Sequence, residues 1–390
     1  MHKLVITYLR GFLIAALFKD DRMVSVSINK KDGGNIVNSI YLGRVRDIRR
    51  PMGAAFIELA DGLMGYLNLD DPGFDEVKVT GGRPLRPGDE FPVQVIKEGV
   101  GDKYAALSAS LTLPGRYVVA TERPGHISVS SRIKKSAARS HLKELLAPLS
   151  GNGGFIARTN CEGAPDEAIF DEARQLSEEL SGLRRVSVSR TVHSLLFSPD
   201  PEWMSMARDL PEGEPARVIT DIPDVAARIR EATARSSNTA VEYYEDKDIS
   251  LSVLFRLEST MDRLRQRKVW LDSGAFLVID RTEALVAVDV NFGKSLLKKD
   301  EEESCFQVNR EAAIEIARQI RLRNLAGIII VDFINMREES NYERLRDVIA
   351  KACADDPCRL QLVDFTRLGL AEFTRKKTSI PIVDQLFLLD

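Results

Sequence analysis

The sequence predicts an α/β protein with several domains, and three observations lead to that prediction. At 390 residues the chain is too long for one typical hydrophobic core and about right for two to four domains. A block of short strand-like segments between residues 39 and 111 is divided by turn-rich pieces. The last third alternates strand-like and helix-like segments instead. We therefore expect each region to have its own architecture.

The N-terminal regions are predicted to be rich in strands. Three apolar runs between Leu4 and Ile28, separated by Arg-Gly and Lys-Asp-Asp-Arg, predict a three-stranded meander. Five more strands are expected after it, and their number and spacing fit a small closed barrel such as an OB-fold. These strands are expected at 39–48, 54–59, 65–69, 91–97 and 106–111.

A mixed unit is expected after the barrel, and a sheet with helices in the last third. The mixed unit is predicted to have strands at 127–133 and 153–159 and helices around 136–148 and 165–182. Further helices are expected near 223–236 and 255–268. The last third is predicted to have strands at 274–280, 283–291, 327–333 and 359–365 and helices at about 303–325 and 340–353. Such continuous apolar strands joined through helices indicate a buried sheet covered by helices, with ligands at the strand ends.

Composition is that of an ordinary globular protein, with a formal net charge of −3. This charge argues mildly against nucleic-acid binding, but basic residues cluster at 44–51, 130–143, 263–268 and 375–377, so the sequence is still compatible with local basic patches. The apolar segment 11–18 is far too short to span a bilayer, and we expect a cytoplasmic protein without membrane contact. The four cysteines form no C-x-x-C pair and are expected to be reduced and mostly buried.

Four strands of the last third carry an aspartate at or near their end: Asp280, Asp289, Asp332 and Asp364. An aspartate in such a place often only caps a turn or helix. Asp289 and Asn291, however, lie on the same face of an extended chain, because side chains alternate. Together with Asp332 on a neighbouring strand they would suit an oxygen-ligand magnesium site, and hard oxygen ligands also accept manganese. From spacing alone, capping or a salt bridge to an arginine is the alternative.

Other catalytic patterns are weak. The four histidines, His2, His126, His141 and His193, are scattered and lie outside the last third, so neither a histidine base nor a zinc cluster is expected there. The sequence also contains no G-x-x-x-x-G-K-[ST] phosphate loop.

At the strand-end aspartates the sequence resembles a known family. The segments VIDRTEALVAVDVN, NREAAIEIARQIRLRNLAGIIIVDFINM and RLQLVDFTRLGLAEFTRKK resemble the catalytic core of the RNase E/G endoribonucleases, and the resemblance extends over nearly the whole chain. It implies that Asp289 and Asp332 coordinate magnesium and that Asn291 and Arg359 lie near the scissile phosphate. It also implies single-strand-specific hydrolysis of RNA to 5′-phosphate and 3′-hydroxyl ends, in the processing and decay of rRNA and mRNA.

The resemblance implies two RNA-contacting regions outside the last third. In the barrel, Phe56 and Tyr66 match aromatic positions that contact bases, and Lys97 and Lys103 match basic positions beside them. Aromatic platforms with nearby lysines are how OB-folds hold single strands. Phe56 as an ordinary barrel-core residue is the alternative.

The second region resembles the family's sensor of the RNA 5′ end. Arg158 and Thr159, in GGFIARTN, match residues that grip a terminal monophosphate, a task for which the arginine fork is suited. Gly115 and Val119 match the base-facing side of that pocket. The resemblance therefore implies a preference for 5′-monophosphorylated, A/U-rich RNA.

The resemblance also implies a domain order. An RNase H-like scaffold at 1–37 and 205–268 is interrupted by the OB-fold RNA-binding domain at 38–112 and the 5′-end sensor unit at 113–204. A DNase I-like α/β catalytic domain at 269–390 follows. Larger bacterial members carry a C-P-x-C zinc link and a small dimerisation domain after this core, whereas this sequence ends at DQLFLLD. We therefore expect no zinc and no zinc-linked dimer, and the oligomeric state stays open.

Two other classes of function compete with a nuclease acting on RNA. The first is a non-catalytic RNA-binding protein on the same scaffold. Its weakness is that a pure binder has no reason to place Asp289, Asn291 and Asp332 together near a phosphate that carboxylates repel. The second is a metal-dependent DNA phosphodiesterase, since base stacking does not distinguish RNA from DNA and only a 2′-hydroxyl contact would.

Overall fold

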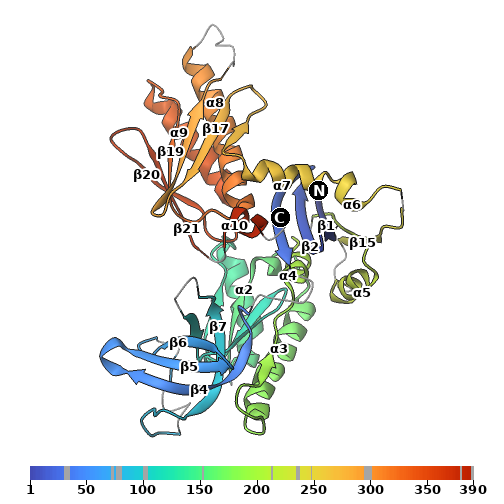
Figure 1. The fold of residues 1–390 in the computed structure, drawn as a ribbon, viewed down its shortest axis with the longest axis vertical. Helices are drawn as coiled ribbons and strands as arrows, with labels where there is room; N and C mark the ends of the chain where they lie inside the picture. Colours follow the sequence, from blue (N-terminus) through green and yellow to red (C-terminus); the bar gives the residue numbers. More distant parts are fainter. Residues whose placement is uncertain are drawn as a thin grey trace. The chain divides into compact units, whose positions relative to one another are not determined.

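The computed structural model describes residues 1–29, 36–71, 74–75, 81–99, 104–151, 153–211, 214–233, 238–246, 248–293, 301–377 and 380–387 (Figure 1). The chain divides into two compact units, which are described separately. Unit 1 contains Met1–Lys31, Arg217–Ala226 and Glu242–Asp390. Unit 2 contains Asp32–Ala216 and Ala227–Val241.

Unit 1 begins with an antiparallel meander, which confirms the prediction for the first 28 residues. Its strands are β1 (His2–Leu9), β2 (Phe12–Lys19) and β3 (Arg22–Asn29). Strands β14 (Ala216–Thr220) and β15 (Thr239–Tyr243) extend the sheet to the order β15-β14-β1-β2-β3. Helices α6 (Leu251–Leu254) and α7 (Leu257–Arg265) belong to unit 1, and α5 (Pro223–Ala232) begins in unit 1 and ends in unit 2. Apolar residues of α6 and α7 pack on the sheet and form one core with Val5 and Ile14.

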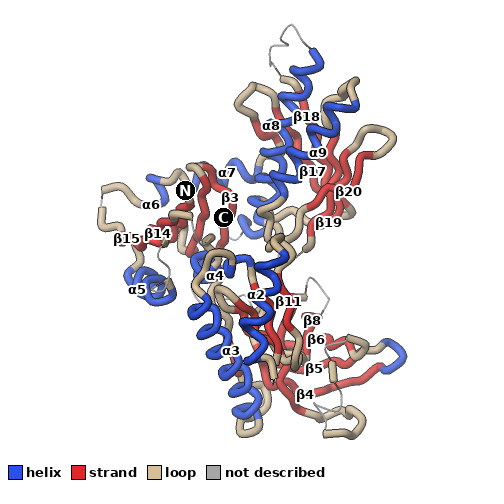
Figure 2. The backbone as a smooth tube through the Cα atoms, turned by 180° about the vertical axis from the view of Figure 1, so that it is seen from behind, coloured by secondary structure: helices blue, strands red, loops and turns tan. Residues whose placement is uncertain are grey.

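The second sheet of unit 1 holds the strand-end aspartates. Its order is β16-β17-β18-β19-β21-β20, and among its pairings only that of β18 with β19 is parallel. The strands are β16 (Lys268–Trp270), β17 (Phe276–Arg281), β18 (Leu285–Asn291), β19 (Gly327–Asp332), β20 (Gln361–Phe365) and β21 (Ala371–Arg375). The helices are α8 (Glu301–Leu322), α9 (Glu339–Cys353) and α10 (Ile382–Leu386). Helix α8 forms the crossover between β18 and β19, and Figure 2 shows α8 and α9 beside the strands.

This sheet is covered on one face only, so the prediction of a sheet buried by helices is wrong for its second face. Val286, Val288 and Val290 of β18 are buried in a core shared with α8 and α9. The alternate residues point the other way, and Ala287 and Asp289 are exposed. Ile328 of β19 is 56% exposed on the same side, because its run of isoleucines alternates between core and open surface. Because these strands are apolar, their composition did not reveal that one face of the sheet is open.

Unit 2 contains the predicted closed barrel. Its strands are β4 (Ile40–Arg49), β5 (Ala54–Ala60), β6 (Leu63–Asn68), β7 (Glu90–Lys97) and β8 (Ala105–Ser108). They pair in the order β4-β5-β6-β8-β7, and the pairing of β4 with β7 closes the barrel. Ile57, Leu67 and Val93 are among the residues that fill its interior. Gly65 has to be a glycine, because an added Cβ would collide with Leu107 on the neighbouring strand.

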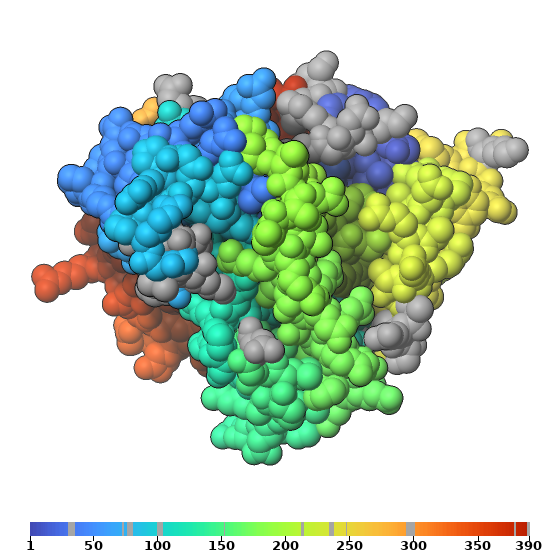
Figure 3. Space-filling view, turned by 90° about the horizontal axis from the view of Figure 1, so that it is seen from below, coloured from blue at the N-terminus to red at the C-terminus, as the bar shows by residue number. Residues whose placement is uncertain are grey.

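The remainder of unit 2 is a four-stranded sheet with two main helices. Its strands pair in the order β11-β12-β10-β9. They are β9 (Thr112–Pro114), β10 (Val118–Thr121), β11 (Ile127–Val129) and β12 (Gly154–Ala157), and β13 (Leu195–Phe197) pairs with β4 of the barrel. The helices are α2 (Ser136–Leu146), α3 (Asp166–Ser187) and α4 (Glu202–Arg208). Helix α3 (green) lies beside the barrel (blue and cyan) and contacts β7 (Figure 3). Phe155 and Ile169 belong to the core between this sheet and its helices.

Candidate functional site

Asp289 and Asp332 lie at the ends of two adjacent parallel strands. The register of β18 with β19 places Asp289 directly opposite Asp332. Neighbouring strands are roughly 5 Å apart, so both carboxylates lie together on the open face. Both residues are exposed. The strand arrangement expected from the sequence is therefore present and brings the two carboxylates side by side.

Asn291 is oriented by this pair, and the pair itself has little compensating charge. The Asn291 amide nitrogen donates a hydrogen bond of 2.7 Å to Asp289 Oδ2. Within the described residues the Asp332 side chain makes no hydrogen bond or ion pair. Like charges directly opposite each other in a sheet are destabilising, so this arrangement costs free energy unless a cation joins it.

A hard divalent cation fits the donor set on this face. Magnesium takes one or two protein carboxylates and completes its shell with water and substrate phosphate. The described part of the chain contains no group of three or more histidine, cysteine, aspartate or glutamate side chains that could hold a metal ion. The donor set at Asp289 and Asp332 is therefore two exposed carboxylates with one amide beside them.

The other two strand-end aspartates are satisfied by the protein. Asp280 forms an ion pair with Arg267. Asp364 accepts hydrogen bonds from the Phe365 backbone (2.8 Å) and from Arg346 (3.0 Å), and these partners lower the pKa of its carboxyl group. The structural alternative of capping or ion pairing therefore describes Asp280 and Asp364, but it does not describe Asp332.

Arg359 is not brought to the carboxylate pair. It is exposed and precedes β20, whose first residue, Gln361, pairs with Thr374 opposite Ile328. Ile328 is four residues before Asp332 along β19, which corresponds to about 13 Å at ~3.3 Å per residue. Arg359 therefore lies toward the end of the sheet at which β19 begins, and its role at the phosphate stays a prediction.

Sequence reasoning missed a basic residue that lies nearer to Asp332. The turn between β20 and β21 is at the end of the sheet where β19 finishes, because Val331 pairs with Ala371. Within this turn an added Cβ at Gly369 would lie 3.6 Å from Asn335 Oδ1, in the loop that follows Asp332. The same turn carries the exposed Arg367. Only the hairpin formed by β21, which the sequence did not predict, reveals this placement.

The barrel places its predicted RNA-contacting residues in one row. Phe56 pairs with Tyr66, Tyr66 with Ala106, and Ala106 with Lys97 across four strands. Phe56 and Tyr66 are half-buried, and neither belongs to the interior core, so the alternative of Phe56 as a core residue is wrong. Lys97 is exposed at the end of β7. Lys103 lies outside the described residues.

A third ring, missed from the sequence, joins this aromatic row. Tyr104 is 54% exposed, and its ring centroid lies 5.5 Å from that of Phe56. Phe56 and Tyr66 are 6.2 Å apart, and the Arg49 guanidinium lies over Phe56 at 5.6 Å. Tyr104 directly precedes β8 outside any strand pattern, which is why periodicity gave no signal for it.

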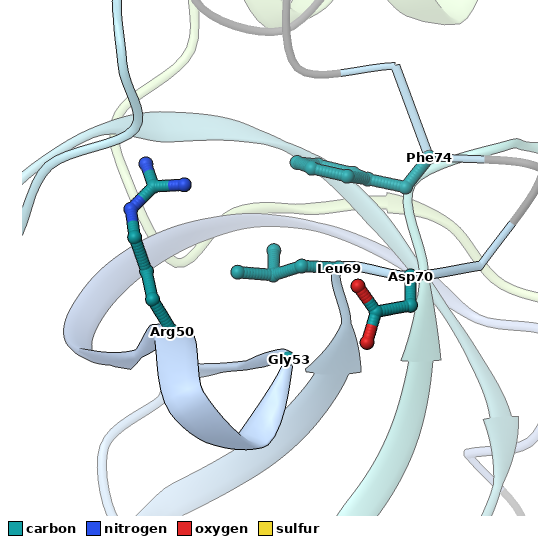
Figure 4. Close-up of a pocket in the computed structure, with 5 residues that line it drawn as sticks. All are labelled: Arg50, Gly53, Leu69, Asp70 and Phe74. Carbon is teal, nitrogen blue, oxygen red and sulfur yellow. The ribbon is translucent and has the colours of Figure 1, made fainter.

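A hollow of about 240 Å³ opens at the rim of the barrel. It is lined by Arg50, Gly53, Leu69, Asp70 and Phe74. In Figure 4 Leu69 lies between the Arg50 and Asp70 side chains, so the hollow offers both charges and an apolar floor. Gly53 has a φ of +59°, and an added Cβ would collide with the Asp70 carboxylate.

The residues predicted to form a 5′-end pocket lie around Arg158. Arg158 Nη1 donates to the Gly115 carbonyl at 2.5 Å, and Thr159 shares a 3.1 Å hydrogen bond with Ser130. Gly115 has to be a glycine, because an added Cβ would lie 2.5 Å from the Glu172 carboxylate. Val119 is half-buried on β10, where it pairs with Pro114. The structure thus groups Arg158, Thr159 and Gly115, with Val119 on the adjoining strand.

Two carboxylates that were not expected hold Arg158 and the 116–118 backbone in place. Glu172 of α3 accepts backbone hydrogen bonds from residues 116, 117 and 118, at 2.7, 2.7 and 3.0 Å. Asp209 makes a two-oxygen ion pair with Arg158, at 2.8 and 2.7 Å. Burial opposes the charge on Arg158, but the hydrogen bonds and charge of Asp209 outweigh it and raise the pKa of the guanidinium. The arginine expected to bind phosphate is therefore already paired.

One of the four cysteines, Cys161, lies beside Arg158, where its thiol donates a hydrogen bond to the Tyr117 carbonyl at 3.1 Å. All four are free, as expected, and Cys161, Cys305 and Cys353 are buried. Burial raises the pKa of both Cys161 and Cys353 to about 12, so neither thiol provides a nucleophile near neutral pH.

In the described part of the chain, none of the helices has the length and apolar character needed to cross a membrane.

Comparison with known proteins agrees with the resemblance in the sequence. The model of the Ribonuclease E/G family matches residues 112–378. Ribonuclease E of Nostoc sp. is 32% identical over 375 residues, which cover 93% of this chain and 54% of the relative. Ribonuclease E of Synechocystis sp. is 31% identical over 377 residues, with 93% and 55% covered.

Ribonuclease G of Escherichia coli is 31% identical over 368 residues, which cover 90% of this chain and 75% of the relative. The chain thus spans about half the length of the two ribonuclease E relatives and three quarters of ribonuclease G. The family match covers most of the chain, and it includes β18, β19 and the sheet that carries Arg158. On these grounds the chain belongs to the Ribonuclease E/G family.

Proposed function

We propose that this chain is a metal-dependent endoribonuclease that cuts single-stranded RNA internally and leaves 5′-phosphate and 3′-hydroxyl ends. The observation that carries the proposal is the in-register pair of Asp289 and Asp332 on an open sheet face, with Asn291 hydrogen-bonded to Asp289. The relatives are named ribonucleases, which supports RNA as the class of substrate. Its biological setting would be the processing and decay of rRNA and mRNA.

In this proposal Asp289 and Asp332 hold magnesium, or manganese, through their oxygens. When bound, such an ion polarises the phosphate and lowers the pKa of a bound water. Asp289 also fixes the orientation of the Asn291 amide, whose second N–H can then donate to the scissile phosphate. Because both carboxylates repel a phosphate, placing the scissile phosphate directly against this pair requires the metal. This requirement separates a nuclease from the non-catalytic RNA-binding protein.

The barrel would hold the single strand and the Arg158 pocket would select its 5′ end. Each base stacked on the Phe56 and Tyr66 platform is worth roughly 1–3 kcal/mol, and Lys97 at the end of the same row suits the backbone. At the pocket, a 5′-monophosphate has to share or displace Asp209, since that carboxylate occupies the arginine fork. A preference for 5′-monophosphorylated, A/U-rich RNA is part of the proposal.

The proposal includes a finer assignment of the fold. The sheet begun by β1–β3 is assigned to the RNase H-like scaffold, with boundaries at 1–37 and 205–268. The barrel at 38–112 and the sensor at 113–204 are its inserts, and the six-stranded sheet belongs to a DNase I-like domain at 269–390.

The test is cleavage of an end-labelled, unstructured A/U-rich RNA with a 5′-monophosphate, in magnesium or in EDTA. Wild type is compared with Asp289→Asn, Asp332→Asn and the matched control Asp280→Asn, which removes an aspartate of the same sheet that is ion-paired. We expect internal cuts that need magnesium and are at least about a hundredfold slower in Asp289→Asn and Asp332→Asn, since a metal contributes several kcal/mol. RNA that shifts on a gel but stays intact with wild type would favour the non-catalytic protein.

A further inference from the structure

Beside the carboxylate pair, the open face of the six-stranded sheet carries an exposed tryptophan next to a half-buried phenylalanine. Trp270 of β16 is 61% exposed, and its ring centroid lies 5.3 Å from that of Phe276 on β17. Their neighbours Leu271 and Leu277 are buried in the core, so alternation places both rings on the open side. A tryptophan is a large apolar surface to leave in water, and here the fold leaves it uncovered within the described residues.

A lysine lies against these rings without a carboxylate partner. The Lys268 Nζ atom is 3.9 Å from the centroid of Trp270 and 3.6 Å from that of Phe276. Within the described residues it forms no ion pair, whereas the adjacent Arg267 is paired with Asp280. The cluster therefore combines two aromatic rings with one positive charge that no described carboxylate neutralises.

The register of the sheet places this cluster in line with the candidate active site. Trp270 pairs with Phe276, and Phe276 pairs with Asn291. In the neighbouring row Lys268 pairs with Val278, Val278 with Asp289, and Asp289 with Asp332. Two strand spacings amount to about 10 Å, so Trp270 is about that far from Asn291 along its row.

We propose that Trp270, Phe276 and Lys268 form a subsite that stacks one nucleobase of a bound single strand and contacts its backbone phosphate beside the scissile bond. Aromatic rings combined with a nearby cation are the chemistry by which proteins hold single-stranded nucleic acid without sequence preference. A lysine without a partner among the described residues favours a polyanion as the occupant over an apolar protein surface. This inference rests on the proposed function, because it gives the substrate of that site a second anchor.

The two tryptophans of the chain make a direct test feasible. Trp203 is 5% exposed, so Trp270 dominates any fluorescence change caused by a ligand that stacks from solvent. We would titrate a short A/U-rich oligoribonucleotide into full-length Asp289→Asn in EDTA, and into the double variant that also carries Trp270→Phe. Quenching that disappears with Trp270→Phe is the expected result. An unquenched Trp270 under conditions where the oligonucleotide binds by anisotropy overturns the subsite.

A kinetic experiment separates stacking from a structural role. Trp270→Ala is expected to raise KM roughly tenfold while kcat and Tm stay near wild type, and Trp270→Phe to recover most of the loss. Phe387→Ala, which removes a 69% exposed ring elsewhere in unit 1, is the matched control and should change neither constant. An RNA with one abasic nucleotide scanned across the cleavage site should reveal a position that matters to wild type but not to Trp270→Ala.

The outcomes also separate this subsite from the proposed function. If Trp270→Ala cleaves RNA as fast as wild type and with the same KM, the subsite is overturned and the assignment as a nuclease stands. Absence of wild-type cleavage contradicts the proposed function, while the fluorescence titration still decides whether Trp270 stacks a base. A fluorescence change that follows protein concentration without RNA would assign the rings to contact with a second copy of the chain, and this would overturn the proposal.

Discussion

The carboxylate pair of unit 1 and the arginine of unit 2 show two ways in which a fold can present charge to a ligand. Asp289 and Asp332 are placed opposite each other with no described cation beside them. Arg158 is also charged, but its guanidinium already donates hydrogen bonds to the Asp209 carboxylate and the Gly115 carbonyl. The first arrangement needs a ligand to become favourable, whereas the second requires a ligand to compete. Binding at the pair should therefore stabilise the protein, and binding at the arginine should be weaker than its charge suggests.

The largest effect is expected at Arg158, where substitutions test whether Asp209 competes with a ligand. Arg158→Ala should remove any preference for a 5′-monophosphate over a 5′-hydroxyl end. Asp209→Asn should strengthen that preference, by about tenfold, because the competing charge is lost while Gly115 still holds the guanidinium. The measurement is kcat/KM for two RNAs that differ only at the 5′ end. Equal preferences in wild type and both variants would remove the sensor assignment.

A smaller effect is expected in the barrel, which presents aromatic rings rather than charged groups to a ligand. Tyr104→Ala should weaken binding of a short single-stranded RNA by about fivefold, which corresponds to the lower limit for one stacked base. Tyr8→Ala, at a 42% exposed ring of unit 1, is the matched control. Fluorescence anisotropy in EDTA gives both affinities. If Tyr104→Ala binds like the control, the third ring is not part of the RNA surface.

The smallest effect is a pH dependence of stability that arises from a carboxylate held by several hydrogen bonds. Glu302 at the start of α8 accepts hydrogen bonds from the Arg337 and Glu338 backbone and from the Asn341 side chain, at 3.0–3.1 Å. These bonds lower its pKa, the Arg337 backbone bond being the largest cause. Glu302 thus stabilises the native state above its unfolded pKa of about 4.3, and this contribution is lost as pH falls through the lowered native value.

The matched measurement is Tm against pH for wild type and Glu302→Gln. We expect the two curves to differ above about pH 5 and to converge below about pH 3. Parallel curves over this range would mean that Glu302 does not anchor the loop after Asp332.

Local patterns predicted the strands well, and distant contacts escaped them. The alternation in EALVAVDVN placed Asp289 and Asn291 on one face, and the crossover through α8 brought Asp332 beside them. Periodicity could not show which face of the sheet stays open, because Ile328 looks as apolar as a core residue. It also missed β21, a five-residue strand with charged residues inserted between β19 and β20.

The same limit applies to the candidate sites. Asp209 is 51 residues from Arg158 in the sequence, and no spacing rule connects an arginine after a strand with the end of a distant helix. Tyr104 lies outside any strand pattern, and only the closure of the barrel brings it to Phe56. Residue type and alternation therefore predicted which groups carry chemistry, but the partners that satisfy or compete with them depend on tertiary packing.

The most direct test of the metal site at Asp289 and Asp332 is thermal unfolding with and without magnesium. Wild type, Asp289→Asn and the control Asp280→Asn would be melted in EDTA and then in excess magnesium. We predict that magnesium raises the Tm of wild type and control but not of Asp289→Asn, because only the intact pair binds the ion. In EDTA, Asp289→Asn should melt at or above wild type, because a like-charge repulsion is gone. An equal magnesium shift in wild type and Asp289→Asn would contradict the assignment of the pair as a metal site.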